Sequence, residues 1–552
     1  MRAKTPITAA TVFCFPSETT VSFILLIIAA LFISVNIGQN IERSIQVIFE
    51  TPGETESVKL FPDAEKDNSE TDSSNSNKAS AWPYVKTLIF PFATTLILFF
   101  TSTLIFLNNP QRIIRRLKLI GNENEKVREF REYAAYVSSS VIKRSPDILI
   151  TDSIAGAHAQ AFGTGFRNFL RLDGGLRILK IKSQRLFDAI LFHELGHFMN
   201  KDIAKTYFSV SIWYSAISLF ALPLVLLLTI VFFQGVFEKL FSGGIDAKEL
   251  GKIVTVNLPN LLKALGQLIL LFGTIIFFRN SVLRSREYYA DLRSVTFGYK
   301  DELSGILGKA SAEKISLWKR FKTFHPTSAS RLAVINEPEK LFTISGEMSF
   351  FSGVLQSFVV NGLIFPLINI AMLMSVITMP DIDSGVNSTT RYSIFISMVL
   401  PFLLFILASP LPAFAVSGSI GLQSIKASYS GSISQAGSGI SAKKYLTIPL
   451  MFIFGNEVGY LLQPISNLSP KSFEQAIIIA LLQFIVFISI VLIMFISHYA
   501  GKNLSSRDPS EKSFKARIYS NLALETLVLA VIMFITTSLR LAIVLNFWKP
   551  FS

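Results

Sequence analysis

The stretch "AILFHELGHFMNKD", from Ala189 to Asp202, is the most informative part of the chain. It places His193 and His197 four residues apart, with Glu194 directly after the first histidine. Only 5 of the 552 residues are histidines, so this arrangement is rare by chance. The alternative is a helix on which polar residues happen to cluster. Two imidazoles and a carboxylate on an apolar face nevertheless need partners, because burying them alone is unfavourable.

The composition predicts a polytopic α-helical membrane protein. Hydrophobic residues make up 50% of the chain and charged residues 16%, whereas soluble domains carry about 25% charged residues. Apolar runs long enough to cross a bilayer recur along the sequence. We expect about nine spans, near Val21–Ile37, Leu88–Leu107, Tyr207–Phe233, Val254–Phe278, Phe350–Thr378, Ile394–Val416, Tyr445–Ile465, Ala476–Ile496 and Leu522–Val544. The first is interpreted as a signal anchor. Polar residues interrupt the fourth, for which a re-entrant segment is the alternative.

The net charge of +14 does not indicate nucleic-acid binding, because the charges sort by side of the membrane. The loop Gly38–Pro83 contains the acidic stretch "PDAEKDNSETDSSNSN", whereas "NNPQRIIRRLKLIGNENEK" after the second span is rich in arginine and lysine. By the positive-inside rule the amino terminus and the basic segments face the cytosol. We therefore expect the lipid bilayer, and no nucleic acid, as a partner.

Two inner segments, Asn108–Thr206 and Arg279–Ser349, are long enough to fold. In the first, "DILITD" has a strand pattern, "AQAFGTGFRNFLRLDGGL" indicates a hairpin or edge strands, and 184–200 has helical apolar spacing. We therefore expect a cytosolic α+β catalytic domain, interrupted by a membrane hairpin at about 207–278.

On the expected helix, His193 and His197 lie one turn apart on the same face. Both imidazoles can then reach one zinc ion at about 2.0–2.1 Å, while Glu194 is rotated aside and can act as general base toward a water on the metal. The only cysteine is Cys14, so a third ligand must offer nitrogen or oxygen. The segment "RNSVLRSREYYADLRSV" offers Glu287 and Asp291 on one helical face; a charged juxtamembrane helix is the alternative.

Three motifs together resemble the membrane zinc metallopeptidases of the HtpX and CAAX-prenyl-protease type. They are HELGH at 193–197, Glu-x-x-Ala-Asp within "SREYYAD", and "FHPTSASRL" at Phe324–Leu332. The segment "AQAFGTG" is similar to the strand before the family's metal helix, although Gln160 stands where asparagine is usual. The resemblance extends over about Ser145–Glu337, and it implies a zincin-like domain.

The resemblance also implies roles for individual residues. His193, His197 and Glu287 would hold one zinc ion per chain, and Glu194 would be the base. Asp291 would accept from a ligand imidazole and orient it. His325 and Arg331 would either steady the oxyanion or pack the site.

A strand beside the metal helix, Gln160, Ala161, Phe162 and Gly163, would bind an extended substrate through main-chain hydrogen bonds.

Three domains are expected. Residues 1–107 hold two spans and the acidic outer loop, 108–349 form the peptidase domain, and 350–552 form a five-span membrane domain to which the resemblance does not extend.

We expect a multi-pass membrane zinc metalloendopeptidase, in a bacterial cell membrane rather than the ER membrane, that cleaves polypeptides in or near the membrane. The HtpX likeness favours membrane-protein quality control. The alternatives are prenylated-peptide processing, a signalling receptor-protease that cuts a regulator, and a transporter-like protein with an inactive protease domain.

Overall fold

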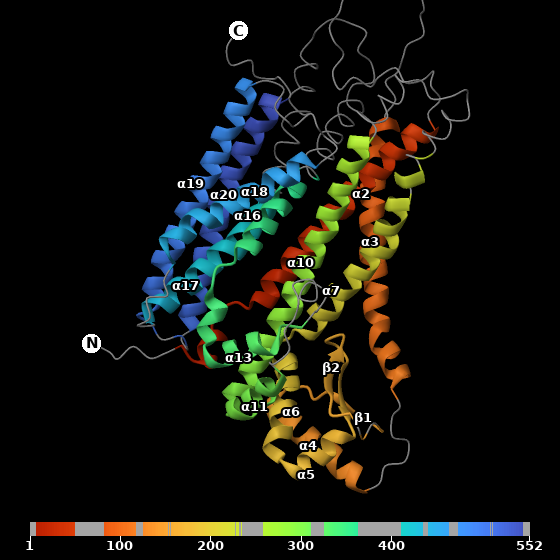
Figure 1. Cartoon of the computed structure of the whole chain (residues 1–552), viewed down its shortest axis with the longest axis vertical. Helices are drawn as coiled ribbons and strands as arrows, with labels where there is room; N and C mark the ends of the chain where they lie inside the picture. Colours follow the sequence, from red (N-terminus) through yellow and green to blue (C-terminus); the bar gives the residue numbers. More distant parts are fainter. Residues whose placement is uncertain are drawn as a thin grey trace, which may run out of the picture.

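The computed structural model describes residues 7–49, 82–117, 125–152, 156–226, 258–310, 325–360, 410–433, 440–462, 473–507 and 512–544, with a few single positions between them. These residues are mostly helical, and one small sheet is present among them. Long helices form the upper part in Figure 1, and the sheet lies at the lower end with several short helices.

The sheet has three strands in the order β1-β3-β2, where β1 is Asp147–Thr151, β2 is Ala159–Gly163 and β3 is Asn168–Asp173. β2 pairs antiparallel with β3, as the hairpin pattern predicts, and β1 pairs parallel with β3. The turn after β2 requires glycine, because Gly163 has φ +146° and a Cβ there would lie 2.2 Å from the Arg167 carbonyl oxygen. Because β2 pairs only with β3, it is an edge strand with one side unpaired within this sheet.

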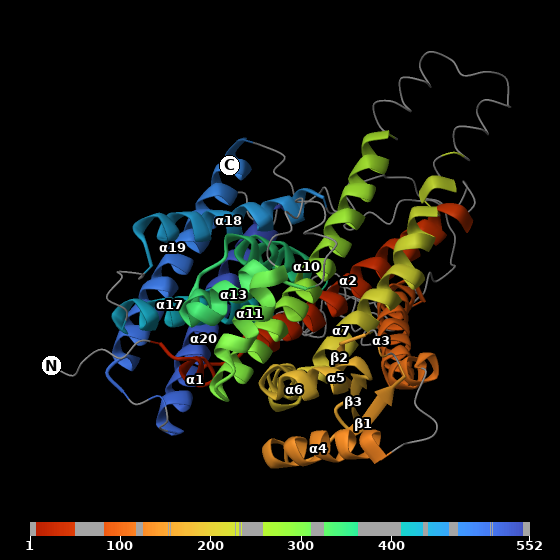
Figure 2. The same cartoon turned by 60° about the horizontal axis from the view of Figure 1, so that its bottom comes forward.

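Helices α4 (Glu125–Val141), α5 (Gly175–Lys182) and α6 (Gln184–Met199) complete this small unit. α4 is amphipathic, and its buried residues join the apolar side chains of the sheet and of α6 in one core. Figure 2 shows α4 along the outside of the unit, with the sheet and α6 next to it. α6 ends at Met199 with Asn200 as its C-cap, and Lys201 then turns the chain with φ 54°.

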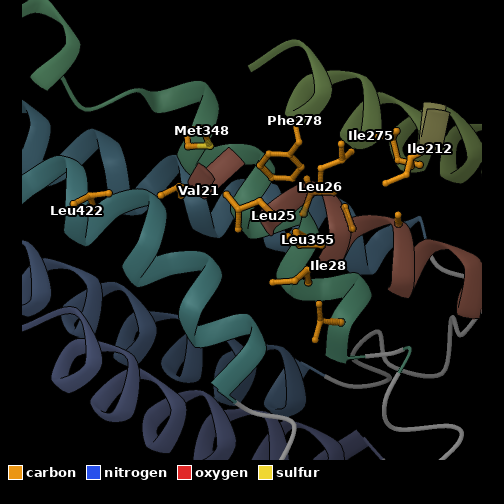
Figure 3. Packing of buried hydrophobic residues seen from close by; sticks show 14 of the residues in the cluster. Val21, Leu25, Leu26, Ile28, Ile212, Ile275, Phe278, Met348, Leu355 and Leu422 are labelled. Atoms are coloured by element: carbon orange, nitrogen blue, oxygen red, sulfur yellow. The ribbon is translucent and has the colours of Figure 1, made fainter. Parts of the chain in front are cut away.

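Helix α2 (Glu18–Phe49) is the centre of the largest apolar core. It packs against α3 (Trp82–Arg116), α7 (Ile203–Ala216) and α10 (Leu258–Thr296). Figure 3 shows Leu25 and Leu26 of α2 near Phe278 and Ile275 of α10. α10 is one continuous helix of 39 residues, so the interrupted fourth apolar run and the charged segment after it belong to a single element.

The carboxyl-terminal part contains α16 (Pro410–Val416), the π-helix η4 (Ser417–Gly421), α17 (Leu422–Ile433), α18 (Ala442–Leu461), α19 (Phe473–Leu504) and α20 (Lys512–Val544). These helices lie together on one side of the molecule in Figures 1 and 2. Their own apolar core joins residues of α16, α18, α19 and α20.

The amino-terminal segment connects the two sides. The ring of Phe15 meets those of Phe342, Tyr429 and Phe514 at centroid distances of 5.0 to 5.4 Å. Glu18, at the start of α2, accepts a hydrogen bond of 2.8 Å from the fully buried Lys426 of α17.

Six described helices are long and apolar enough to cross a membrane: Glu18–Gln39, Leu88–Arg116, Ile203–Ile230, Leu261–Thr296, Gln475–Leu504 and Ser513–Thr536. They correspond to the first four and the last two of the nine expected spans, so the chain has the helices of a multi-pass membrane protein. Most of the expected fifth and sixth spans lies outside the described residues. The seventh coincides largely with α18, which is not among the six.

Candidate metal centre

The site forms where α6 crosses α10 at very close range. A Cβ built on Gly196 of α6 would lie 3.1 Å from both the Cα and the carbonyl oxygen of Ala290 on α10. The small residues of the HELGH and Glu-x-x-Ala-Asp motifs therefore face each other. Because Glu287 and Asp291 flank Ala290 on the same helix, this crossing brings both carboxylates to the histidines of α6.

The three expected ligands converge. His193, His197 and Glu287 each offer one ligand atom, and these atoms lie within 4.8 Å of one another. The Nε2 atoms of His193 and His197 are 3.6 and 3.8 Å from the two carboxylate oxygens of Glu287. Ligands placed tetrahedrally around zinc at its usual bond lengths would be about 3.4 Å apart. The donor set of two imidazoles and one carboxylate thus fits a zinc ion in both chemistry and spacing.

Each histidine is held through its other ring nitrogen. His193 Nδ1 lies 2.9 Å from Asp291 Oδ1, and His197 Nδ1 lies 3.3 Å from Asp202 Oδ2. Such carboxylate partners fix the ring orientation of metal-binding histidines. The family resemblance implied this role for Asp291.

The electrostatic environment of His193 favours its charged form. Burial lowers the pKa of His193, but its hydrogen bonds with Asp291 and Glu287 outweigh burial and raise this pKa to about 10. Since a metal ion takes the neutral imidazole, metal binding at this residue is coupled to the loss of a proton.

Glu194 lies between the metal helix and the sheet. Its Oε2 accepts a hydrogen bond of 2.7 Å from the backbone N–H of Ala161 in β2. The pairing of Gln160 with Arg171 and of Phe162 with Phe169 directs their main-chain groups toward β3, so those of Ala161 point to the free edge. The carboxylate of Glu194 therefore sits at the free edge of β2.

Three further polar side chains surround Glu287. Arg286 Nε is 2.9 Å from Glu287 Oε1, and His325 Nδ1 is 3.6 Å from the same oxygen. Arg331 Nη1 is 3.9 Å from Glu287 Oε2, and its Nε donates to Asp291 Oδ2 at 2.7 Å. The side chain of His325 is 71% exposed whereas that of Arg331 is 19% exposed, so these two residues are placed differently around the site. Arg286 was not among the site residues expected from the sequence.

The expected substrate strand is placed in three different ways. Ala161 faces the free edge as described, and Gln160 donates from Nε2 to the Tyr207 hydroxyl at 3.2 Å. The ring of Phe162 is fully buried and stacks on that of Phe169, so it belongs to the core.

A cavity of about 770 Å³ contains the site. Its walls include the ligands, Glu194 and residues 157–160 at the sheet edge, and also Val210 and Tyr214 of the third candidate span and Arg279 and Leu283 of α10. The cavity thus extends from the free edge of β2 to residues of two candidate membrane spans.

Comparison with protein-family models gives a match over residues 123–339, to the model of peptidase family M48. The chain carries an M48 peptidase domain. It is accordingly a zinc-dependent metalloendopeptidase, with the His193, His197 and Glu287 group as a site for one metal ion. Comparison with curated proteins and with solved structures gave no match. The family resemblance inferred from the motifs is confirmed, and the M48 match ends at residue 339, before the carboxyl-terminal membrane helices.

Proposed function

We propose that the chain hydrolyses peptide bonds of membrane or membrane-proximal polypeptides at this centre. The observation that carries the proposal is the cavity of about 770 Å³, which joins the metal-site residues to Val210, Tyr214 and Leu283 of two candidate spans. A polypeptide that leaves the bilayer beside α7 or α10 has a short path to the site. The role we propose is removal of damaged membrane proteins, which the resemblance to the HtpX type favours.

In the proposed mechanism His193, His197 and Glu287 hold the zinc, which when bound activates water and polarises the scissile carbonyl. Glu194 takes the proton of the attacking water, and its hydrogen bond with the Ala161 N–H aims the carboxylate. Asp291 and Asp202 orient the two imidazoles. We assign His325 to contact with the substrate, because it is exposed, and Arg331 to positioning, because Asp291 holds it at 2.7 Å.

The substrate would bind as an extra strand. The main-chain groups of Ala159 and Gly163 point to the same free edge of β2 as those of Ala161. Hydrogen bonds to this edge would hold an extended segment with little sequence preference.

The test is a comparison of metal content and cleavage in the purified full-length protein. Wild type should hold about one zinc per chain, and Glu194→Gln should keep it but lose about 10²–10⁴-fold in turnover, the usual contribution of general-base catalysis. Glu337→Gln, an exposed carboxylate outside the cavity, is the matched control and should retain full activity. Near-normal proteolysis by Glu194→Gln would refute the mechanism.

The preference for membrane polypeptides is tested in detergent micelles, by comparing the cleavage rates of a single-span polypeptide and a soluble unfolded one. We expect faster cleavage of the single-span polypeptide. Equal rates would leave the peptidase assignment intact but refute the preference for membrane polypeptides.

A second candidate function, processing near the carboxyl terminus of a lipidated peptide, is favoured by Arg279. This buried arginine lines the cavity eight residues from Glu287 on the same helix, about 12 Å along its axis. Three extended residues span about 10 Å. The guanidinium could therefore bind a terminal carboxylate about three residues beyond the cleaved bond. A strong preference for a free over an amidated carboxyl terminus, lost in Arg279→Gln, would establish this function; equal cleavage of both peptides would exclude it.

A further inference from the structure

The carboxyl-terminal helices contain a buried glutamate that the peptidase mechanism does not use. Glu525 lies on α20 within the candidate span Ser513–Thr536 and is 1% exposed. An ionisable side chain at such a position is unfavourable in a bilayer unless it is neutralised, and such residues generally mark sites of ion or proton binding.

One carboxylate oxygen of Glu525 is satisfied and the other is not. Oε1 accepts a hydrogen bond of 2.6 Å from the Ser497 hydroxyl of α19. Oε2 has no hydrogen-bond partner among the described residues and is buried against Gly421, the last residue of the π-helix η4. A Cβ built on Gly421 would lie 2.1 Å from Oε2. The absence of a side chain at Gly421 therefore makes the space that the carboxylate occupies.

Small and polar residues continue from this point along one face of η4 and α17. We call Ser417, Gly421, Ser424 and Ser428 the polar seam; their spacing of four, three and four residues keeps them on one side of the helix. The Ser417 hydroxyl lies 2.5 Å from that of Thr526, next to Glu525. The Ser424 hydroxyl is fully buried and has no partner among the described residues.

The seam ends at a histidine. Ser428 is hydrogen-bonded to His498 Nδ1 at 2.8 Å, and His498 follows Ser497 in α19. From Ser497 to the end of α19 at Leu504 is about 10 Å, and α17 ends at Ile433, about 8 Å beyond Ser428. The seam thus leads from Glu525 toward the end of the bundle at which α17 and α19 terminate.

No positive side chain faces Glu525 within the described part of the bundle. The elements with most contacts to α20 are α16, η4 and α19, and Phe514 of α20 also meets Phe15 and Tyr429. α16 and η4 contain no ionisable residue, and the nearest one along α19 is His498, which bonds Ser428. On α17, Lys426 is committed to Glu18 at 2.8 Å. A carboxylate buried here is therefore stable only if its charge is neutralised.

We propose that Glu525 is a cation-binding site of the carboxyl-terminal membrane helices, loaded with a proton or a sodium ion through the polar seam. The bound cation sits at Oε2, beside the backbone at Gly421. Ser497 orients the carboxylate through Oε1, and His498 with Ser428 passes protons or admits ions from the aqueous end. This activity is separate from peptide-bond hydrolysis.

The test uses N,N′-dicyclohexylcarbodiimide, which modifies protonated carboxyl groups in apolar surroundings. The full-length protein in detergent is treated across a pH series, in sodium chloride or choline chloride, and modification of the Glu525 peptide is quantified by mass spectrometry. We expect modification that falls about tenfold per pH unit above its midpoint, as for one proton. Lower modification in sodium than in choline identifies sodium as a competing ligand, and equal modification in the two salts identifies a proton site.

Matched glycine variants test the geometry. Gly421→Ala places a methyl group on Oε2 and should shift the midpoint or abolish modification. Gly418→Ala lies on the same π-helix, where a Cβ would make only ordinary contacts at 3.6 Å, and should behave as wild type. Retained zinc content and a single peak in gel filtration verify that both variants are folded.

Two outcomes would overturn the proposal. One is the absence of modification at Glu525 at every pH. The other is modification that depends on neither pH nor salt, which would make Glu525 a permanently protonated structural residue.

Discussion

Glu287 and Glu525 are both almost fully buried, at 4% and 1% exposed, yet their surroundings differ in kind. Glu287 lies within 4 Å of two histidines of α6, of Arg286, and of His325 and Arg331. Glu525 accepts one hydroxyl hydrogen bond and lies against glycine backbone. Burial alone therefore does not decide the state of a carboxylate. Nitrogen donors around Glu287 stabilise its anion for metal binding, whereas the neutral groups around Glu525 leave the charge to a small cation.

The largest effect is expected when each carboxylate is replaced by its amide, which tests whether the two glutamates have different roles. Glu287→Gln should lose zinc and reduce proteolysis to background, a loss at least as large as the 10²–10⁴-fold expected for the base. Glu525→Gln should retain about one zinc per chain. Metal analysis and proteolysis of the two purified variants provide the measurement. Full zinc occupancy in Glu287→Gln would place the third ligand elsewhere.

The pH dependence of zinc affinity sharpens the comparison further. Because the pKa of His193 is raised to about 10, the imidazole carries a proton at neutral pH that zinc must displace. Zinc affinity should rise with pH, by about tenfold per unit and so about 100-fold between pH 6 and pH 8. Competition with a chelator of known affinity measures it. A flat profile would mean that His193 is already neutral in the metal-free protein.

A smaller effect is expected for the carboxylates that orient the histidines. Asp291→Asn should weaken zinc binding by about 10–100-fold, and Asp202→Asn should act similarly through His197. The effect at Asp291 should be the larger, since Asp291 also holds Arg331. Asp147→Asn, an exposed aspartate at the start of β1, is the control. Unchanged zinc affinity in both test variants would show that the ligands are oriented without them.

The smallest effect concerns the free edge of β2, a kind of surface that the described carboxyl-terminal helices do not offer. Ala159→Pro removes one outward N–H at the start of the strand, a position that tolerates proline. The loss of one hydrogen bond should lower kcat/KM about 2- to 10-fold without change in zinc content. Ala159→Val keeps the N–H and should cleave normally. Equal rates for the two variants would argue against strand addition.

The sequence predicts most of the metal centre because its signals are local. The spacing of His193 and His197 fixes one helical face, and the glycines after β2 mark the hairpin. The positive φ of Gly163, by contrast, was not evident from the sequence.

Other features depend on packing between distant segments. The contact of Asp202 with His197 requires the turn at Lys201, and the surroundings of Glu525 require Ser497 and Gly421 from two other helices. Periodicity places Glu525 in an apolar run but does not identify its neighbours. The expected ninth span began at Leu522, whereas the candidate span begins at Ser513. The charged segment at the start of this helix, taken alone, has the composition of a loop.

Because α10 is unbroken, a single helix carries both a candidate membrane span and the ligand Glu287. The helix is about 58 Å long, and Glu287 lies about 22 Å along its axis from Phe272, near the middle of its apolar part. If α10 tilts as a rigid body by about 5° around Phe272, Glu287 moves by about 2 Å. Spanning helices adjust their tilt to the thickness of the bilayer. A change in bilayer thickness would thus be transmitted along α10 to its crossing with α6, where the metal ligands lie.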